Sequence, residues 1–93
     1  MVVGVRSWEL ALAGCQSLKD KRRVVKSLKD RLHNRFNVSA AEVDYQDAWQ
    51  RAALAASVVS TERRHAEEVL GSCDRRVAGE PLVHVVAATL EFR

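Results

Sequence analysis

The sequence predicts an α+β fold in which a four-stranded antiparallel sheet carries two helices on one face. Four segments show the two-residue alternation, or the continuous apolar character, of β-strands. Two other segments repeat apolar residues with the period of an α-helix, and each lies between two of the strand segments. The order strand–helix–strand–strand–helix–strand is the split βαβ arrangement of such a sheet.

Length and composition are those of one small globular domain over residues 1–93. The chain is 47% hydrophobic and 29% charged, which excludes a disordered chain. No apolar run approaches the roughly 20 residues that cross a bilayer, so no membrane partner is expected. Met1 leads directly into a strand pattern, so we expect no signal peptide. Cys15 and Cys73 lie far apart without a CxxC spacing, which predicts reduced thiols in a cytoplasmic protein.

The first strand is predicted over Val2–Leu12, with Arg6 the one charged residue on its more apolar face. The first helix begins at Ser17, which can cap the amide three residues further on, and Asp20 occupies the acidic position of a capping box. One stripe of this helix is apolar and is expected to face the core: Leu18, Val24, Val25, Leu28, Leu32 and Phe36.

The second and third strands are predicted over Phe36–Asp44 and Gln50–Ser60, joined as an antiparallel hairpin. The apolar pattern changes phase between Ala40 and Ala41, which predicts a β-bulge there.

The second helix is expected to begin at a cap formed by Ser60 or Thr61 and to run to about Val77. Gly79 is placed to end it. The fourth strand, Leu82–Phe92, is apolar on both faces.

Together these elements predict a ferredoxin-like βαββαβ sandwich. Because both helices cover the same face, the other face of the sheet has no cover within the chain. So much apolar surface is typical of contact with a second subunit or a ligand, so we expect a homodimer. The residues expected on the uncovered face are Val3, Val5, Ala53, Ala55, Val59, Val83 and Val85.

The positive charge of the chain is concentrated in Ser17–Phe36. This segment has eight of the fifteen basic residues and two acids, a net +6, so the rest of the chain sums to −3. Its first turn and a half is basic, which opposes the helix dipole and sets like charges four residues apart. A phosphate site or an RNA backbone would favour this arrangement, and the alternative is a solvated basic face. The candidate anion-binding residues are Lys19, Lys21, Arg22, Arg23, Lys26 and Lys29.

The hairpin between the second and third strands is another candidate interaction surface. It gathers Glu42, Asp44 and Asp47 among polar and aromatic residues, and it could also meet the basic helix of a second subunit. The alternative is that the two aspartates only shape the turn. The acids lack a regular ligand spacing, so no metal is expected. The candidate residues are Asp44, Gln46, Asp47, Trp49, Gln50 and Arg51.

No residue set indicates a reaction. The sequence has no P-loop, GxGxxG or Ser/His/Asp set, and none of its three histidines has another histidine or a cysteine three or four residues away as a metal partner. Cys15 precedes the basic helix, where a thiolate could be favoured, but no histidine is near it in the sequence. The third strand, QRAALAASVV, lacks the stacking aromatics of an RRM. We therefore expect neither an enzyme nor a cofactor.

The segments SLKDKRRVVK and NVSAAEVDYQDAWQRA in combination closely resemble the YlxP-like family, domain of unknown function 503. The resemblance covers essentially the whole chain and implies a ferredoxin-like fold in a cytoplasmic bacterial protein. The family's genes are often found among translation-initiation and ribosome-assembly genes, which implies a link to RNA or the ribosome. No activity is established for the family, so the resemblance assigns no catalytic residue. Arg6 departs from the mostly apolar first strand expected in the family.

The sequence therefore predicts a non-catalytic, homodimeric binding protein that associates with RNA or ribosomal particles through its basic first helix. The alternative is a homodimeric structural or protein-interaction module that binds no nucleic acid.

Overall fold

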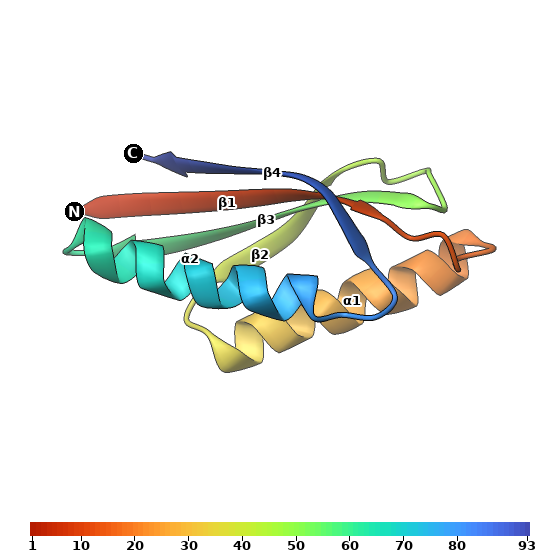
Figure 1. The fold of residues 1–93 in the computed structure, drawn as a ribbon, viewed down its shortest axis with the longest axis horizontal. Helices are drawn as coiled ribbons and strands as arrows, with labels where there is room; N and C mark the ends of the chain where they lie inside the picture. Colours follow the sequence, from red (N-terminus) through yellow and green to blue (C-terminus); the bar gives the residue numbers. More distant parts are fainter.

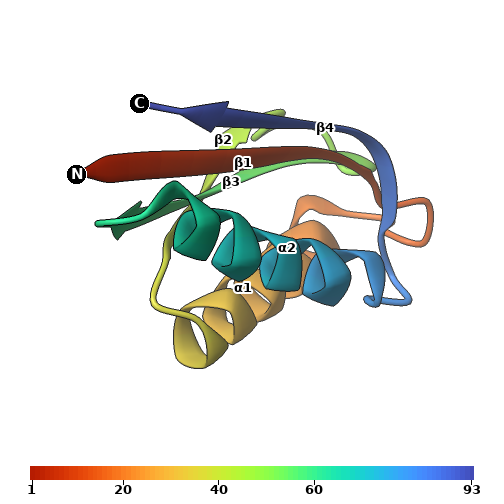
Figure 2. The ribbon, with the colours of Figure 1, turned by 60° about the vertical axis from the view of Figure 1, so that its left-hand side comes forward.

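The structure, a computed structural model, describes all 93 residues and has the predicted element order. The strands form one antiparallel sheet in the order β2-β3-β1-β4. Both helices lie against the same face of this sheet, and no element covers the other face (Figures 1 and 2). The predicted ferredoxin-like fold is therefore confirmed. The element bounds are β1 Val2–Ala11, α1 Leu18–Arg35, β2 Ser39–Asp44, β3 Arg51–Ser60, α2 Arg63–Ala78 and β4 His84–Phe92.

The core lies between the sheet and the helices. Alternate residues of β1 and β3 face the helices, and the buried stripes of α1 and α2 pack on them. Each fully buried leucine stabilises the fold by roughly 1.5–3 kcal/mol. Neither helix is long and apolar enough to cross a membrane. The largest fully buried apolar side chains are Trp8, Leu10, Leu12, Leu28, Leu32, Leu54 and Leu70.

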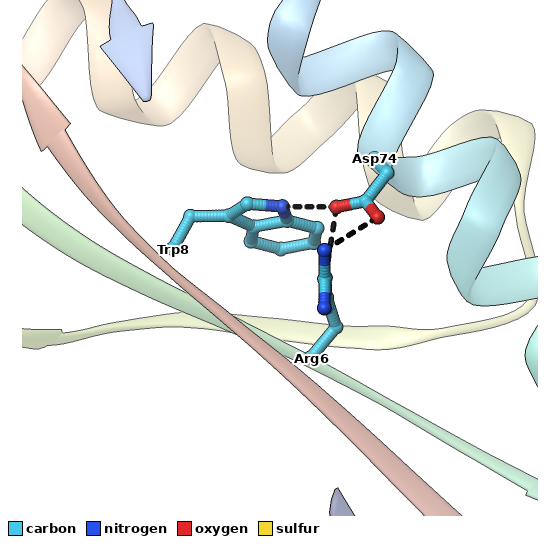
Figure 3. A network of polar contacts seen from close by, with 3 residues as sticks. All are labelled: Arg6, Trp8 and Asp74. Carbon is cyan, nitrogen blue, oxygen red and sulfur yellow. Dashed lines mark hydrogen bonds and ion pairs between the residues drawn. The ribbon is translucent and has the colours of Figure 1, made fainter. Parts of the chain in front are cut away.

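Arg6, which stands on the apolar face of β1, is neutralised from α2 (Figure 3). Its Nη2 lies 2.7 Å from Asp74 Oδ2, and its Nε donates to Asp74 Oδ1 at 2.9 Å. The buried indole of Trp8 donates from Nε1 to the same Oδ1 at 2.6 Å. One carboxylate thus satisfies a buried indole N–H and a guanidinium, and it ties the central strand to α2.

The two helices begin differently. Ser17 caps α1 as predicted, because its Oγ accepts from the Asp20 amide at 3.1 Å. The predicted cap of α2 is wrong: Glu62 occupies the N-cap position without a side-chain hydrogen bond. Ser60 is unavailable as a cap because β3 extends to it, where it pairs with Val2. Its hydroxyl instead accepts from the Glu62 amide at 3.1 Å.

The second strand begins later than predicted and bulges at a different place. After α1 the chain packs Val38 into the core, so β2 begins only at Ser39. Ala40 and Ala41 pair in unbroken register with β3, and the predicted bulge between them is wrong. The register shifts instead at Val43, between Glu42 and Asp44.

A second bulge, in β4, changes the face of the sheet on which two valines lie. The register between β1 and β4 shifts at Val86, which places Val85 opposite the core residue Leu10. Val83 and Val85 therefore pack against the core, and the prediction that they line the uncovered face is wrong. We call the face opposite the helices the uncovered face. It displays Val3, Val5, Ala53, Ala55 and Val59 as predicted, together with Ala87, Thr89 and Glu91 of β4.

Candidate functional site

The charges of the molecule are separated between its two layers. Helices α1 and α2 together carry twelve basic and five acidic residues, a net +7. The rest of the chain carries three basic and seven acidic residues, a net −4. The net positive charge of the molecule therefore lies in its helix layer.

The exposed basic residues lie mainly on the first half of α1. Lys19, Arg22 and Arg23 are exposed, and none of them has a carboxylate within ion-pair distance. Asp20 is the one acid in this turn, and its Oδ2 accepts from the Gln16 amide at 3.2 Å. These three positive side chains therefore remain free to bind an anion.

Two further candidates on α1 have other surroundings. Lys26 is exposed and lies 2.8 Å from Asp30 Oδ2, one turn further on. This hydrogen bond raises the pKa of Lys26 and lowers the pKa of Asp30. Lys29 is half-buried. Both can contribute charge, but less freely than the first half of the helix.

The expectation that Lys21 contacts an anionic partner is wrong, because its side chain is buried. It is 1% exposed. Its ammonium lies 2.9 Å from Glu42 Oε2 of β2 and donates to the Tyr45 carbonyl oxygen. Glu42 Oε2 is buried without a hydrogen-bond partner, so the ion pair with Lys21 is what compensates its charge. Lys21 therefore fastens the start of α1 beneath the hairpin.

The β2–β3 hairpin and the start of α1 lie at the same end of the molecule (Figure 1). Tyr45 adopts the left-handed φ of 63°, which is uncommon for a residue with a side chain. Three contacts hold it. Asp44 Oδ1 accepts from its amide at 2.7 Å, its carbonyl accepts from the Ala48 amide at 3.0 Å, and its hydroxyl donates to Glu9 Oε1 at 2.5 Å. The last contact also raises the pKa of Tyr45.

The hairpin candidates divide into anchored and free residues. Asp44 accepts a hydrogen bond from the Tyr45 amide and so shapes the turn, which is the alternative role given for it above. Gln50 Nε2 donates to the Cys15 carbonyl at 3.3 Å, and Arg51 Nη1 lies 3.5 Å from Glu9 Oε2. The side chains left for contact with a partner are Gln46, Asp47 and Trp49, which are all exposed.

The cysteines and histidines do not form a reactive cluster. Burial raises the pKa of Cys73 to about 11, and burial together with Asp20 raises the pKa of Cys15. The Cys15 thiolate is therefore disfavoured, although the loop precedes a basic helix. All three histidines are exposed, and no group of three or more His, Cys, Asp or Glu side chains could hold a metal ion.

Sequence reasoning missed residues that act across long distances in the chain. Glu9 accepts a hydrogen bond from Tyr45 and forms an ion pair with Arg51. Glu80 Oε2 lies 2.5 Å from Nη1 of Arg31. Glu9 had one local signal, since it is the only acid in an apolar strand. Arg31 and Glu80 are 49 residues apart, and no local pattern links them.

The fold and the basic helix layer define a small ferredoxin-like protein with a polarised surface. Residues 3–90 match the family described as "Protein of unknown function (DUF503)", and the chain belongs to this family. The "Uncharacterized protein YlxP" of Bacillus subtilis (strain 168) is 39% identical over 69 residues, which cover 74% of this chain and 75% of YlxP. The resemblance to YlxP-like proteins is thus confirmed.

A solved structure supports the fold alone. The solution NMR structure of a de novo designed protein with a ferredoxin fold superposes with a TM-score of 0.59 and 12% sequence identity. The match covers 98% of this chain and 85% of the designed protein.

Proposed function

We propose that this protein is a non-catalytic RNA-binding protein that acts on RNA or ribosomal particles through the exposed basic face of α1. The observation that carries the proposal is the position of Lys19, Arg22 and Arg23. They lie at the positive end of the helix dipole, exposed and without carboxylate partners. Like charges four residues apart cost about 0.2–0.5 kcal/mol per pair, so folding alone does not favour this placement.

A phosphate backbone would compensate both for the repulsion between like charges and for the position of these charges at the positive end of the helix dipole. Phosphate oxygens neutralise the crowded charges, and the field at the start of a helix favours an anion. Guanidinium groups can bind phosphate with two parallel hydrogen bonds. The exposed Trp49 lies on the hairpin at the same end of the molecule and offers a surface on which an unpaired base can stack.

The proposal is tested by RNA binding over a series of salt concentrations. The parent protein should bind with a log K that falls steeply with log salt. Arg22→Glu/Arg23→Glu should weaken binding at least tenfold and make the slope shallower by roughly 1.5–2, if each arginine contacts one phosphate. The matched control is Arg64→Glu/Arg93→Glu, which changes net charge equally at exposed sites away from α1. A flat salt dependence, or equal losses in both variants, would contradict the proposal.

Association with ribosomal particles needs a separate test. The tagged protein is recovered from cells with and without nuclease treatment. Recovery of ribosomal particles should depend on intact RNA and on Arg22 and Arg23. Recovery that survives nuclease treatment would show that protein contacts, not RNA, hold the complex.

The second candidate function is a homodimeric interaction module without nucleic acid. It is favoured by the uncovered face, where Val3, Val5, Ala53 and Ala55 are only half-covered within one chain. Ala55→Glu places a charge at the middle of this face, between Ser7 of β1 and Ala41 of β2. Light scattering should then report a dimer for the parent and a monomer for the variant. A dimer that persists in Ala55→Glu would exclude this face as the interface.

A further inference from the structure

A groove between the two helices is lined by arginines from both of them. Helices α1 and α2 run side by side in opposite directions (Figures 1 and 2). Between the end of α1 and the second half of α2 lies a groove of about 360 Å³. No carboxylate lines it. We call it the interhelical arginine groove, and its lining residues are Arg35, Phe36, Ser72, Arg75 and Arg76.

The groove continues towards the end of α2. Arg75 and Arg76 also line a neighbouring hollow together with Arg31 and Glu80. Arg31 is neutralised there, because its Nη1 lies 2.5 Å from Glu80 Oε2. Four arginines from segments about 40 residues apart therefore converge on one side of the helix layer.

The arginines of the groove itself lack acidic partners. Arg75 Nη2 donates to Ser72 Oγ at 2.9 Å, and that hydroxyl donates to the Glu68 carbonyl at 3.1 Å. Arg75 is thereby held in place by a neutral group. Arg35 and Arg76 have no carboxylate within ion-pair distance and no side-chain hydrogen bond. The groove thus combines one oriented guanidinium with two free ones.

Helix dipoles account for only part of this arrangement. Arg35 lies in the last turn of α1, and Arg75 and Arg76 lie in the last turn of α2, where cations are favoured. The dipole of each helix does not require the arginines of both helices to share one groove without an acid. Elsewhere on α2, Arg63 and Arg64 each have a glutamate one turn away.

Building on the proposed function, we propose that the interhelical arginine groove is a second phosphate-binding site, which holds a phosphodiester of the same RNA that contacts α1. Guanidinium groups bind phosphate oxygens with paired hydrogen bonds, which suits them to this ligand more than to a single point charge. Arg22 and Arg35 are 13 residues apart on one helix, roughly 20 Å at 1.5 Å per residue. At about 100° per residue, Arg22 and Arg35 also point roughly 140° apart around α1, so a single strand that binds both sites would cross the exposed face of this helix.

The test compares three double variants in RNA binding over a salt series, using one mixed-sequence RNA hairpin as the probe. Arg35→Glu/Arg76→Glu should weaken binding by about tenfold or more and make the salt slope shallower by roughly 1.5–2. Arg64→Glu/Arg93→Glu, with the same change of net charge, should have a much smaller effect. If the groove variant behaves like this control while Arg22→Glu/Arg23→Glu loses binding, the groove proposal fails and the proposed function stands.

A second measurement separates the groove from the RNA. Tripolyphosphate is titrated into the parent protein and the backbone amides are followed by NMR. The amides of Ser72, Arg75 and Arg76 should shift, and Arg35→Gln/Arg76→Gln, which introduces no repulsive charge, should abolish the shifts. If the parent binds no RNA but these amides shift, the proposed function is rejected and the groove remains a phosphate site for another ligand. Absent shifts, or displacement of tripolyphosphate by equally tight poly-glutamate, would overturn phosphate recognition.

Discussion

The basic residues in the N-terminal halves of the two helices differ in whether they have acidic partners. In α2, Arg63 and Arg64 lie 3.2 and 3.6 Å from glutamates one turn further on. In α1, Lys19, Arg22 and Arg23 have no such partner. The sequence can therefore neutralise an exposed basic turn within one helix, and it does so in α2 only.

The difference shows that a count of positive charges does not identify a binding surface. A basic side chain is available to a partner only when it is exposed and no carboxylate of the same chain neutralises it. Within α1 alone, Lys21 is buried under the hairpin while its neighbour Arg22 is exposed and unpaired. The structural role of Lys21 and the binding role proposed for Arg22 therefore predict different effects of substitution at the two residues.

The largest effect is expected from Lys21→Met. The substitution leaves the carboxylate of Glu42, whose side chain is 19% exposed, without its counter-ion. Removing one partner of a buried ion pair should lower the free energy of unfolding by about 3 kcal/mol, measured by urea denaturation. Lys19→Met, at an exposed site two residues away, should change it by less than roughly 0.5 kcal/mol. Equal stability of the two variants would contradict a structural role for Lys21.

A smaller loss is expected from Asp74→Ala on α2. The change leaves the buried Trp8 indole N–H without an acceptor and Arg6 without its carboxylate. The first effect dominates, because the Arg6 and Asp74 side chains are 22% and 35% exposed and solvent weakens their ion pair. We expect a loss of about 2 kcal/mol in thermal or urea unfolding.

Arg6→Met separates the contribution of the ion pair from that of the indole hydrogen bond. It removes the ion pair but leaves Asp74 to accept from Trp8, so its loss of stability should be clearly smaller than that of Asp74→Ala. A loss as large as that of Asp74→Ala would mean that the guanidinium, and not the indole, is the main group that Asp74 stabilises.

The smallest effect on stability should come from making α2 resemble α1. Glu67→Gln/Glu68→Gln removes two exposed i,i+4 ion pairs, which should cost roughly 0.5 kcal/mol in thermal unfolding. It also frees Arg64 and leaves Arg63 with only its contact to the Phe92 ring, so RNA affinity at low salt should rise. Glu91→Gln, which frees Arg93 outside the helix layer, serves as the control. Unchanged RNA affinity in the helix variant would indicate that unpaired charge alone does not decide binding.

The sequence was sufficient for the elements whose signals are local. The Ser17 cap, the apolar stripe of α1 and the alternation of β3 each depend on residues within a few positions. The structure has all three, except that Leu18 of the predicted stripe does not join the core. The basic surface of α1 was likewise visible, because it follows from the composition of one helix.

The errors arose where a contact or a register depends on distant residues. Lys21 lies within the apolar stripe near the start of α1, so its inward position had a local signal, but its acidic partner Glu42 on a later strand did not. A strand that is apolar on both faces carries no pattern to locate a bulge, so the shift at Val86 was not predictable. The arginines of the interhelical groove belong to two helices, and only their packing brings them together.

The central place of β1 also constrains the order of folding. β1 forms ladders with β3 and β4, and Gly4 pairs with Phe92 near the far end of the chain. During synthesis β1 is therefore made well before β4, and one edge of β1 stays unpaired until β4 has been made. Contacts so distant in sequence slow folding, and an open apolar strand is prone to wrong pairing in the interval. Early burial of its inner face by α1 and α2 would shorten that exposure, but the free edge closes only when β4 is released.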